Sequence, residues 1–467
     1  MKIRNEKINT IIAVAIWLVV WQLGARLVHN ELLLPGPIET LVTLGGLALT
    51  GKFYINIAWT VARCVIAMIV SFLAGIAFAW LSYRSYWVRK FLSLPVGFFK
   101  AVPVMAIIIY VILIAKADWV AIIVCFLMCF PIVYVNVLEG LDAMSAEYLE
   151  LIAVYKIGIR QQLRHIYLQG IQPQIKAAIS LIAGLSWKAV VAAEILSVPK
   201  YSLGYEMMNA KYYLQTPTLF AYIIVIVVIS MAFEKLIKRR LSRIEWRAYE
   251  GSRLKTGGQT VGAKAGVAVP ETYFKSVSKY FKSKAVLENV SIDFATGKTT
   301  ALMGTSGRGK TTMANILAGI EKAEAGEVSA PKNVAYLFQE DRLLPWLNVR
   351  DNILLAGAGG SGGNGQGKAT GELRVRQLAA DLEIEDVLNK LPGELSGGMK
   401  HRVALGRTFF AEGDLVILDE PFRGLDASLK ERIVSRLWKR ETAGRTVVLI
   451  THQIWDAENL ADRIIEM

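Results

Sequence analysis

The sequence predicts two kinds of domain in one chain, an all-α membrane-spanning domain followed by an α/β domain. The chain has 467 residues, of which 54% are hydrophobic and 20% charged, and the apolar excess lies before residue 240. From Glu271 onward, short apolar runs alternate with helical patterns, as in a wound α/β domain. We therefore place the membrane domain at residues 1–249, a flexible linker rich in Gly, Thr, Ala and Lys at 250–270, and the α/β domain at 271–467.

Six stretches of the first domain are apolar enough to form membrane helices, each of which needs about 20 residues. They are Ile8–Val28, Ile57–Leu81, Leu92–Ala115, Trp119–Leu138, Ile175–Val198 and Leu219–Ile237. Lysines and arginines cluster before the first stretch and after the second, fourth and sixth. Because basic residues favour the cytoplasmic side, both ends of this domain should be cytoplasmic. The chain is thus expected to be a multi-pass protein of the inner or plasma membrane, with its α/β domain in the cytoplasm.

The formal net charge of +14 has two possible explanations, an anionic partner such as nucleic acid or the basic flanks of membrane helices. No basic stripe with interleaved aromatic residues appears outside those flanks. We therefore expect the lipid bilayer as a partner and no nucleic acid.

Several polar or reactive residues lie inside the apolar stretches. Arg63 lies near the outer end of the second stretch, where we expect it to snorkel toward the membrane surface. Lys188 and Glu194 in the fifth stretch either pair inside the helix bundle or face the path of a substrate. The three cysteines, which are Cys64, Cys125 and Cys129, have no metal-ligand spacing and are expected to be inert packing residues.

A phosphate-binding loop organises the α/β domain. It fits the pattern G-x-x-x-x-G-K-[ST] and consists of Gly304, Thr305, Ser306, Gly307, Arg308, Gly309, Lys310, Thr311 and Thr312. An apolar strand, Thr299–Met303, precedes the loop, and a helix follows it. The backbone N–H groups of such a loop surround phosphates, the Lys310 ammonium can reach the terminal phosphates, and the Thr311 hydroxyl can bind Mg²⁺. The sequence therefore predicts ATP and Mg²⁺ as cofactors.

A second apolar run, Leu415–Leu418, ends in two acidic residues. Carboxylates at the carboxyl end of a buried strand lie where a metal ion and a water molecule can be held. We expect Asp419 to hold Mg²⁺ and Glu420 to polarise the water that attacks the nucleotide.

The membrane domain resembles the permeases of binding-protein-dependent ABC importers. The sequence predicts a helix at Ser145–Lys156, a break at Gly158 and a second helix at Arg160–Tyr167. Within this stretch, Ala153–Gly158 and Ile166–Gln169 are similar to the loop through which such permeases contact their ATPase. The family pattern has Glu where this chain has Ile152, and Pro where it has Gln169. Three further segments resemble the nitrate, sulfonate, taurine and thiamine-precursor group, namely Gly184–Glu194, Tyr212–Ala221 and Pro35–Pro37. The resemblance implies a six-helix permease of the type I importer class.

The α/β domain resembles the ABC ATPases. Leu395-Ser396-Gly397-Gly398-Met399 is similar to the signature L-S-G-G-Q, with Met in the last place, and Gly424-Leu425-Asp426 resembles the D-loop. The resemblance implies that Ser396, Gly397, Gly398 and Asp426 contact nucleotide. It implies catalytic roles for Gln339 (also a Mg²⁺ ligand), Lys310, Glu420 and the switch histidine His452. Phe281 is expected to stack on adenine, with Tyr280 as the alternative. The family is helical around Gly357–Gly371, where this Gly-rich insert is expected to be locally disordered.

Together these features predict an ATP hydrolase coupled to import of a small solute. The resemblance points to a small organic anion of the sulfonate, taurine or nitrate type, or to a thiamine precursor, delivered by an extracytoplasmic binding protein. In the family the signature faces the phosphate loop of the opposite subunit, so a chain with one permease and one ATPase should act as a homodimer. An ABC exporter half-transporter and a membrane-tethered signalling ATPase are the alternatives.

Overall fold

A computed structural model describes residues 2–28, 30, 33–243, 271–281, 284–305, 307–357 and 365–467, with side chains omitted at 2–11, 243 and 365–370. The chain forms two compact units. Unit 1 comprises Met1–Ala143 and Gly170–Glu245, and unit 2 comprises Met144–Gln169 and Trp246–Met467. The predicted linker at 250–270 lies outside the described residues.

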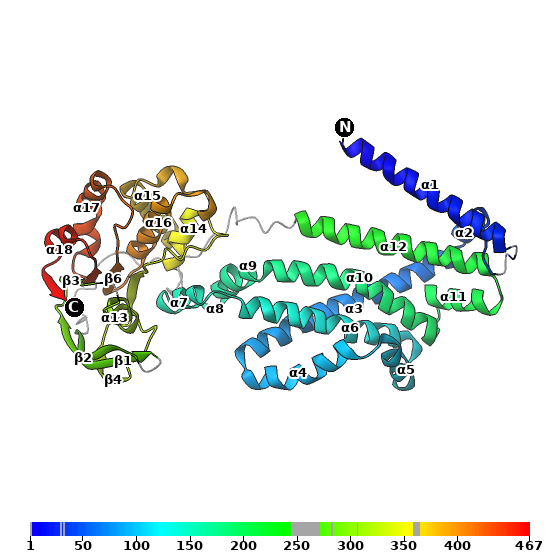
Figure 1. The fold of residues 1–467 in the computed structure, drawn as a ribbon, viewed down its shortest axis with the longest axis horizontal. Helices are drawn as coiled ribbons and strands as arrows, with labels where there is room; N and C mark the ends of the chain where they lie inside the picture. Colours follow the sequence, from blue (N-terminus) through cyan, green and yellow to red (C-terminus); the bar gives the residue numbers. More distant parts are fainter. Residues whose placement is uncertain are drawn as a thin grey trace. The chain divides into compact units, whose positions relative to one another are not determined.

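Unit 1 is helical throughout its described secondary structure. Its helices are α1 (Lys2–Val28), α2 (Pro37–Ala48), α3 (Gly51–Arg84), α4 (Tyr86–Ala101), α5 (Val104–Ile114), α6 (Ala117–Asp142), α10 (Gln172–Ser197), α11 (Leu203–Tyr212) and α12 (Thr216–Arg243). Helices α3, α6 and α10 pack against one another (Figure 1) and form the centre of the unit. The three cysteines are buried in these helices as free thiols, as predicted.

Among the described residues, four helices are long and apolar enough to span a bilayer, which are α3, α6, α10 and α12. The third predicted span, Leu92–Ala115, is wrong as a single helix, because the chain bends by 109° between α4 and α5. Pro103 lies at this break as the N-cap of α5. Proline lacks an N–H and pushes the preceding residue out of the helical conformation, which explains the interruption. The first predicted span falls within α1, whose side chains are described only from Ile12.

A buried ionic cluster joins α3 to α10. Glu194 is fully buried and accepts hydrogen bonds from Thr60 Oγ1 at 2.9 Å and Arg63 Nη1 at 2.9 Å. The expectation that Arg63 snorkels is wrong, since its side chain is only 5% exposed and also pairs with Asp118 at 3.2 Å. A buried carboxylate needs such partners, and Glu194 draws the arginine inward. Lys188 is exposed on the single chain and does not join this cluster.

Unit 2 contains two sheets (Figure 1). The antiparallel sheet has the order β2-β1-β4 and is built from β1 (Thr272–Phe281), β2 (Lys284–Phe294) and β4 (Ala325–Ser329). The parallel sheet has the order β5-β6-β7-β3-β8, built from β3 (Thr299–Met303), β5 (Val334–Leu337), β6 (Leu415–Asp419), β7 (Thr446–Ile450) and β8 (Arg463–Glu466). Strands β5, β6 and β7 are buried along their whole length, which explains their continuous apolar sequence.

The helices that follow β3 in the sequence connect these strands. They are α13 (Lys310–Leu317), α14 (Val349–Leu354), α15 (Gly365–Asp381), α16 (Gly397–Phe410), α17 (Ala427–Thr442) and α18 (Ile454–Leu460), with three short 3₁₀ segments at Leu355–Gly357, Glu385–Val387 and Pro392–Glu394. The expected disorder of the insert is wrong for residues 365–371, which belong to α15. Residues 358–364 lie outside the described part of the chain.

Residues 144–169 pack with the α/β elements of unit 2. The first predicted helix is α7 (Ala146–Val154), and Ser145 caps it by accepting a hydrogen bond from Glu147 N. The predicted second helix consists of α8 (Ile159–Gln161), a π-helical turn (Gln162–Tyr167) and α9 (Leu168–Gly170). The Tyr155 hydroxyl donates to the Tyr336 carbonyl at 3.1 Å, and Trp346 Nε1 donates to the His165 carbonyl at 2.6 Å. We call residues 144–169 the docking segment.

Candidate functional site

The candidate site lies at the carboxyl ends of four adjacent strands. Strands β5, β6, β7 and β3 are neighbours in the parallel sheet, and the chain leaves them at Gln339, Asp419, Thr451 and the phosphate loop, respectively. Carboxyl ends of parallel strands meet at one edge, where α/β proteins usually bind ligands. The sheet order therefore brings together residues up to about 150 positions apart in sequence.

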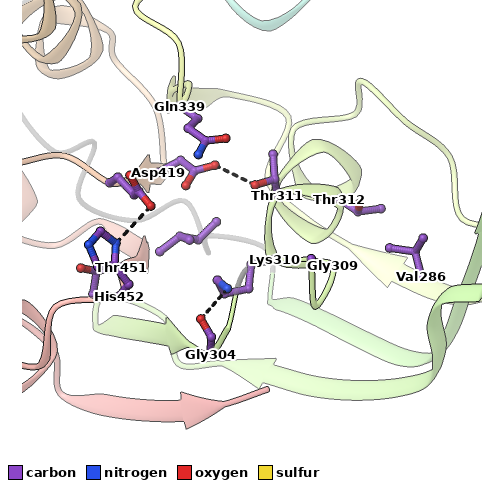
Figure 2. A pocket seen from close by; sticks show the side chains of 13 residues that line it. Val286, Gly304, Gly309, Lys310, Thr311, Thr312, Gln339, Asp419, Thr451 and His452 are labelled. Atoms are coloured by element: carbon purple, nitrogen blue, oxygen red, sulfur yellow. Dashed lines mark hydrogen bonds and ion pairs between the residues drawn. The ribbon is translucent and has the colours of Figure 1, made fainter. Parts of the chain in front are cut away.

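The phosphate loop turns sharply between β3 and α13. Gly309 has φ +87°, and a Cβ there would lie 2.9 Å from the Val286 carbonyl, so only glycine fits. Lys310 begins α13, and its ammonium donates to the Gly304 carbonyl at 2.8 Å (Figure 2). It also donates to the Thr305 carbonyl at 2.8 Å. The loop thus places the lysine and the N-terminus of α13 beside one cavity, the arrangement that binds phosphate groups.

The Thr311 hydroxyl and the Asp419 carboxylate form the candidate Mg²⁺ site. Thr311 Oγ1 donates to Asp419 Oδ2 at 3.0 Å (Figure 2). Burial raises the pKa of Asp419 to about 6, while the hydrogen bond from Thr311 acts in the opposite direction. A hydroxyl and a carboxylate are hard oxygen ligands, which fit Mg²⁺ with phosphates as the remaining ligands. A divalent cation would favour the ionised carboxylate at this buried position.

Glu420 and His452 lie across the cavity from the phosphate loop. His452 Nδ1 lies 3.1 Å from Glu420 Oε1. Glu420 adopts φ +52°, a left-handed conformation that costs a non-glycine residue about 1–2 kcal/mol. Its N–H donates to the Ile450 carbonyl at 2.9 Å, which ties this turn to β7. Strained backbone at a carboxylate beside a phosphate loop is consistent with a catalytic position.

These residues surround a cavity of about 320 Å³ (Figure 2). Ten of the residues predicted from sequence line it, namely Gly304, Gly307, Gly309, Lys310, Thr311, Thr312, Gln339, Asp419, Glu420 and His452. Sequence reasoning missed three lining residues, Val286, Ile450 and Thr451. Ile450 ends strand β7 and Thr451 follows it, directly before His452, a position that could have indicated both residues.

The other predicted residues do not line this cavity among the described residues. Ser396 caps α16 by accepting from Met399 N at 3.3 Å, and Gly397 and Gly398 begin that helix. Asp426 caps α17 by accepting from Leu429 N at 2.9 Å. Neither segment contributes a lining residue to the cavity of its own chain.

The remaining predicted residues belong to β1 and to the phosphate loop. Phe281 is 45% exposed at the end of β1, with the Lys279 ammonium 5.2 Å from its ring centre, and Tyr280 is 43% exposed. Thr305 contributes its carbonyl to Lys310, and Arg308 is exposed in the loop. Ser306 lies outside the described residues.

Comparison with known proteins identifies both parts of the chain. Residues 287–423 match the family described as "ABC transporter", and residues 67–243 match "Binding-protein-dependent transport system inner membrane component". The Aliphatic sulfonates import ATP-binding protein SsuB 1 of Pseudomonas fluorescens is 39% identical over 194 residues, which cover 41% of this chain and 71% of that protein. SsuB 2 of Streptomyces avermitilis is 36% identical over 42% of this chain and 76% of its own length. SsuB 1 of Paracoccus denitrificans is 36% identical over 42% of this chain and 78% of its own length.

The fold and the site define an ATP-hydrolysing cassette attached to a membrane domain, and the chain belongs to the ABC transporter family. It combines a binding-protein-dependent permease with the ATPase in one polypeptide and couples ATP hydrolysis to transport. It is a multi-pass protein of the inner membrane, with its ATPase domain on the cytoplasmic side.

Proposed function

We propose that two copies of this chain form a homodimeric importer of small organic sulfonates. The observation that carries the proposal is the placement of the signature. The described residues of the cavity include the phosphate loop, Asp419, Glu420 and His452, whereas Ser396–Gly398 lie elsewhere on the same chain. The signature of a second copy would complete this cavity, and the signature of this copy would complete the cavity of the second. The dimer would then have two equivalent sites.

Within each site the residues would have distinct roles. Lys310 and the loop N–H groups would bind the phosphates, and Thr311, Asp419 and Gln339 would hold Mg²⁺, which neutralises charge on the phosphates. Glu420 would orient and polarise the attacking water, and His452 would hold that carboxylate and approach the γ-phosphate. The signature N–H groups and Asp426 of the partner copy would close the site, and Phe281 would stack on the adenine.

The docking segment is the proposed route from ATP to the membrane helices. It forms hydrogen bonds to residues before and after Gln339 in the sequence. Tyr155 bonds to Tyr336, and His165 bonds to Trp346. Glu150 also pairs with Arg342, three residues after Gln339. A change at Gln339 on nucleotide binding would therefore reach the segment through short, directly bonded contacts.

The substrate class rests on the relatives. Those named above are aliphatic sulfonate import proteins, and the permease family is the binding-protein-dependent type. An extracytoplasmic binding protein would therefore deliver the sulfonate to the permease. Taurine is a member of this class, and nitrate and a thiamine precursor are the competing substrates.

Transport by the purified protein in liposomes tests this function. In vesicles whose ATPase domains face outward, the lumen corresponds to the extracytoplasmic side and holds the binding protein. ATP added outside should then move labelled alkanesulfonate out of the lumen, which is the direction of import in the cell. Excess unlabelled sulfonate should compete with the labelled solute. If nitrate or a pyrimidine competes and unlabelled sulfonate does not, the proposed substrate class is wrong. ATP hydrolysis without movement of any of these solutes would favour the signalling ATPase, and movement in the opposite direction the exporter.

Glu420→Gln is the matching catalytic variant. ATP binding should persist because the phosphate loop is intact, but turnover should fall by about 10²- to 10⁴-fold as water activation is lost. Glu431→Gln, at an exposed position of α17, is the control and should turn over normally. Normal turnover by Glu420→Gln would show that another group activates the water.

A further inference from the structure

His401 links the signature helix to both catalytic segments. It lies on α16, five residues after Ser396, and its side chain is 3% exposed. Its Nδ1 lies 2.8 Å from Asp341 Oδ1, and its Nε2 lies 3.1 Å from the Glu420 carbonyl and 3.0 Å from the Pro421 carbonyl. One imidazole therefore contacts the segment that follows Gln339 and the turn that carries Glu420.

We propose that His401 is a positioning residue for ATP hydrolysis. Both ring nitrogens face hydrogen-bond acceptors, because a carboxylate lies beside Nδ1 and two carbonyl oxygens lie beside Nε2. A carbonyl can only accept, so Nε2 must carry a proton and donate to the Glu420 and Pro421 carbonyls.

The target of this clamp is the strained turn at Glu420. That residue holds the left-handed φ of +52°, and two hydrogen bonds fix its peptide groups, one from its N–H to Ile450 and one from His401 to its carbonyl. The second bond sets the direction in which the Glu420 carboxylate leaves the turn. A small rotation there would displace the carboxylate from the attacking water, and displacements of about 1 Å can cost about 100-fold in rate.

The same helix also fixes the Gln339 side of the cavity. Arg407, fully buried on α16, donates to the Asp341 and Arg342 carbonyls at 2.8 Å each. His401 holds the Asp341 carboxylate, so α16 grips this segment at its backbone and at its side chain. A movement of α16, whose first turn carries the signature, would shift Gln339 and Glu420 together.

Two substitutions separate positioning from packing. His401→Phe keeps a ring of similar size but donates nothing, and His401→Gln keeps an amide donor. In the full-length protein, His401→Phe should lower kcat for ATP by about 10- to 100-fold with KM within about twofold of wild type. His401→Gln should recover part of kcat.

Each readout has a result that overturns the proposal. Unchanged kcat in His401→Phe would refute the positioning role, as would equal loss of kcat in both variants together with a lowered thermal midpoint. The proposal rests on hydrolysis at the Glu420 site, so wild type and Glu420→Gln are assayed in parallel. If those two hydrolyse ATP equally, the assigned site fails, whatever the His401 variants do.

Discussion

Asp351 shows how one buried carboxyl can set the pH dependence of stability. It is 2% exposed in α14, and its Oδ1 has no hydrogen-bond partner among the described residues. Burial raises the pKa of Asp351 from 3.8 to about 6, with Arg350 acting in the opposite direction. The folded state therefore binds this proton more tightly than the unfolded chain. Stability should fall as pH rises from about 4 to 6, and the loss is complete above that range.

Asp351→Asn removes the buried charge with little change in size. The variant should raise the thermal midpoint of the ATPase at pH 7.5, corresponding to at most about 3 kcal/mol for the shift of roughly two pKa units. The gain should shrink as pH is lowered below 6, where wild type is itself neutral. Calorimetry over this pH range measures it, with the exposed Asp293→Asn as control. A gain that grows toward low pH would contradict the assigned direction.

Single residues also mark the limit of prediction from sequence. The phosphate loop, Asp419 and His452 follow fixed local patterns, so their arrival at one cavity could be predicted. His401 and Arg63 could not, because their roles depend on partners far along the chain, Asp341 and Glu194. Nothing in the local sequence distinguishes a buried arginine in an ion pair from one that snorkels.

At the scale of elements, α10 and α11 meet at a contact that only glycine permits. A Cβ at Gly204 would lie 2.5 Å from Glu194 Cβ and 2.6 Å from the Ile195 backbone nitrogen. The Gly204 N–H also lies 3.4 Å from the Glu194 carboxylate. The close approach of α11 thus helps to enclose the buried ionic cluster.

Gly204→Ala should therefore force the two helices apart and disturb the bonds to Glu194. We expect a loss of about 1–3 kcal/mol, seen as a lower thermal midpoint of the membrane domain in detergent. Gly97→Ala in α4 is the matched control, since a Cβ there meets nothing within 4 Å. Equal midpoints for the two variants would show that α11 moves away at little cost.

Element boundaries were predictable to different degrees. Apolar length located α3, α6, α10 and α12, but the bend at Pro103 was hidden because both α4 and α5 are apolar enough to read as one span. The insert was misjudged for a related reason. Its glycines favour disorder, yet residues from 365 onward continue into α15, which packs on α16 and overrides local preference.

At the scale of the whole molecule, the account requires that each ATP site be shared by two chains. Gly397 is the position at which this can be tested without disturbing the fold. A Cβ at Gly397 meets nothing within 4 Å, and an acidic residue in the first turn of a helix is favourable. Gly397→Asp should therefore fold normally but repel the phosphates of the nucleotide it faces.

The most direct test is ATP hydrolysis by mixed dimers of Lys310→Ala and Gly397→Asp chains, isolated with two different affinity tags. Each variant alone should be nearly inactive. The mixed dimer combines both defects in one site and leaves the other intact, so it should recover up to about half of wild-type activity. Mixed dimers as inactive as either variant alone would contradict a site shared between two copies of the chain.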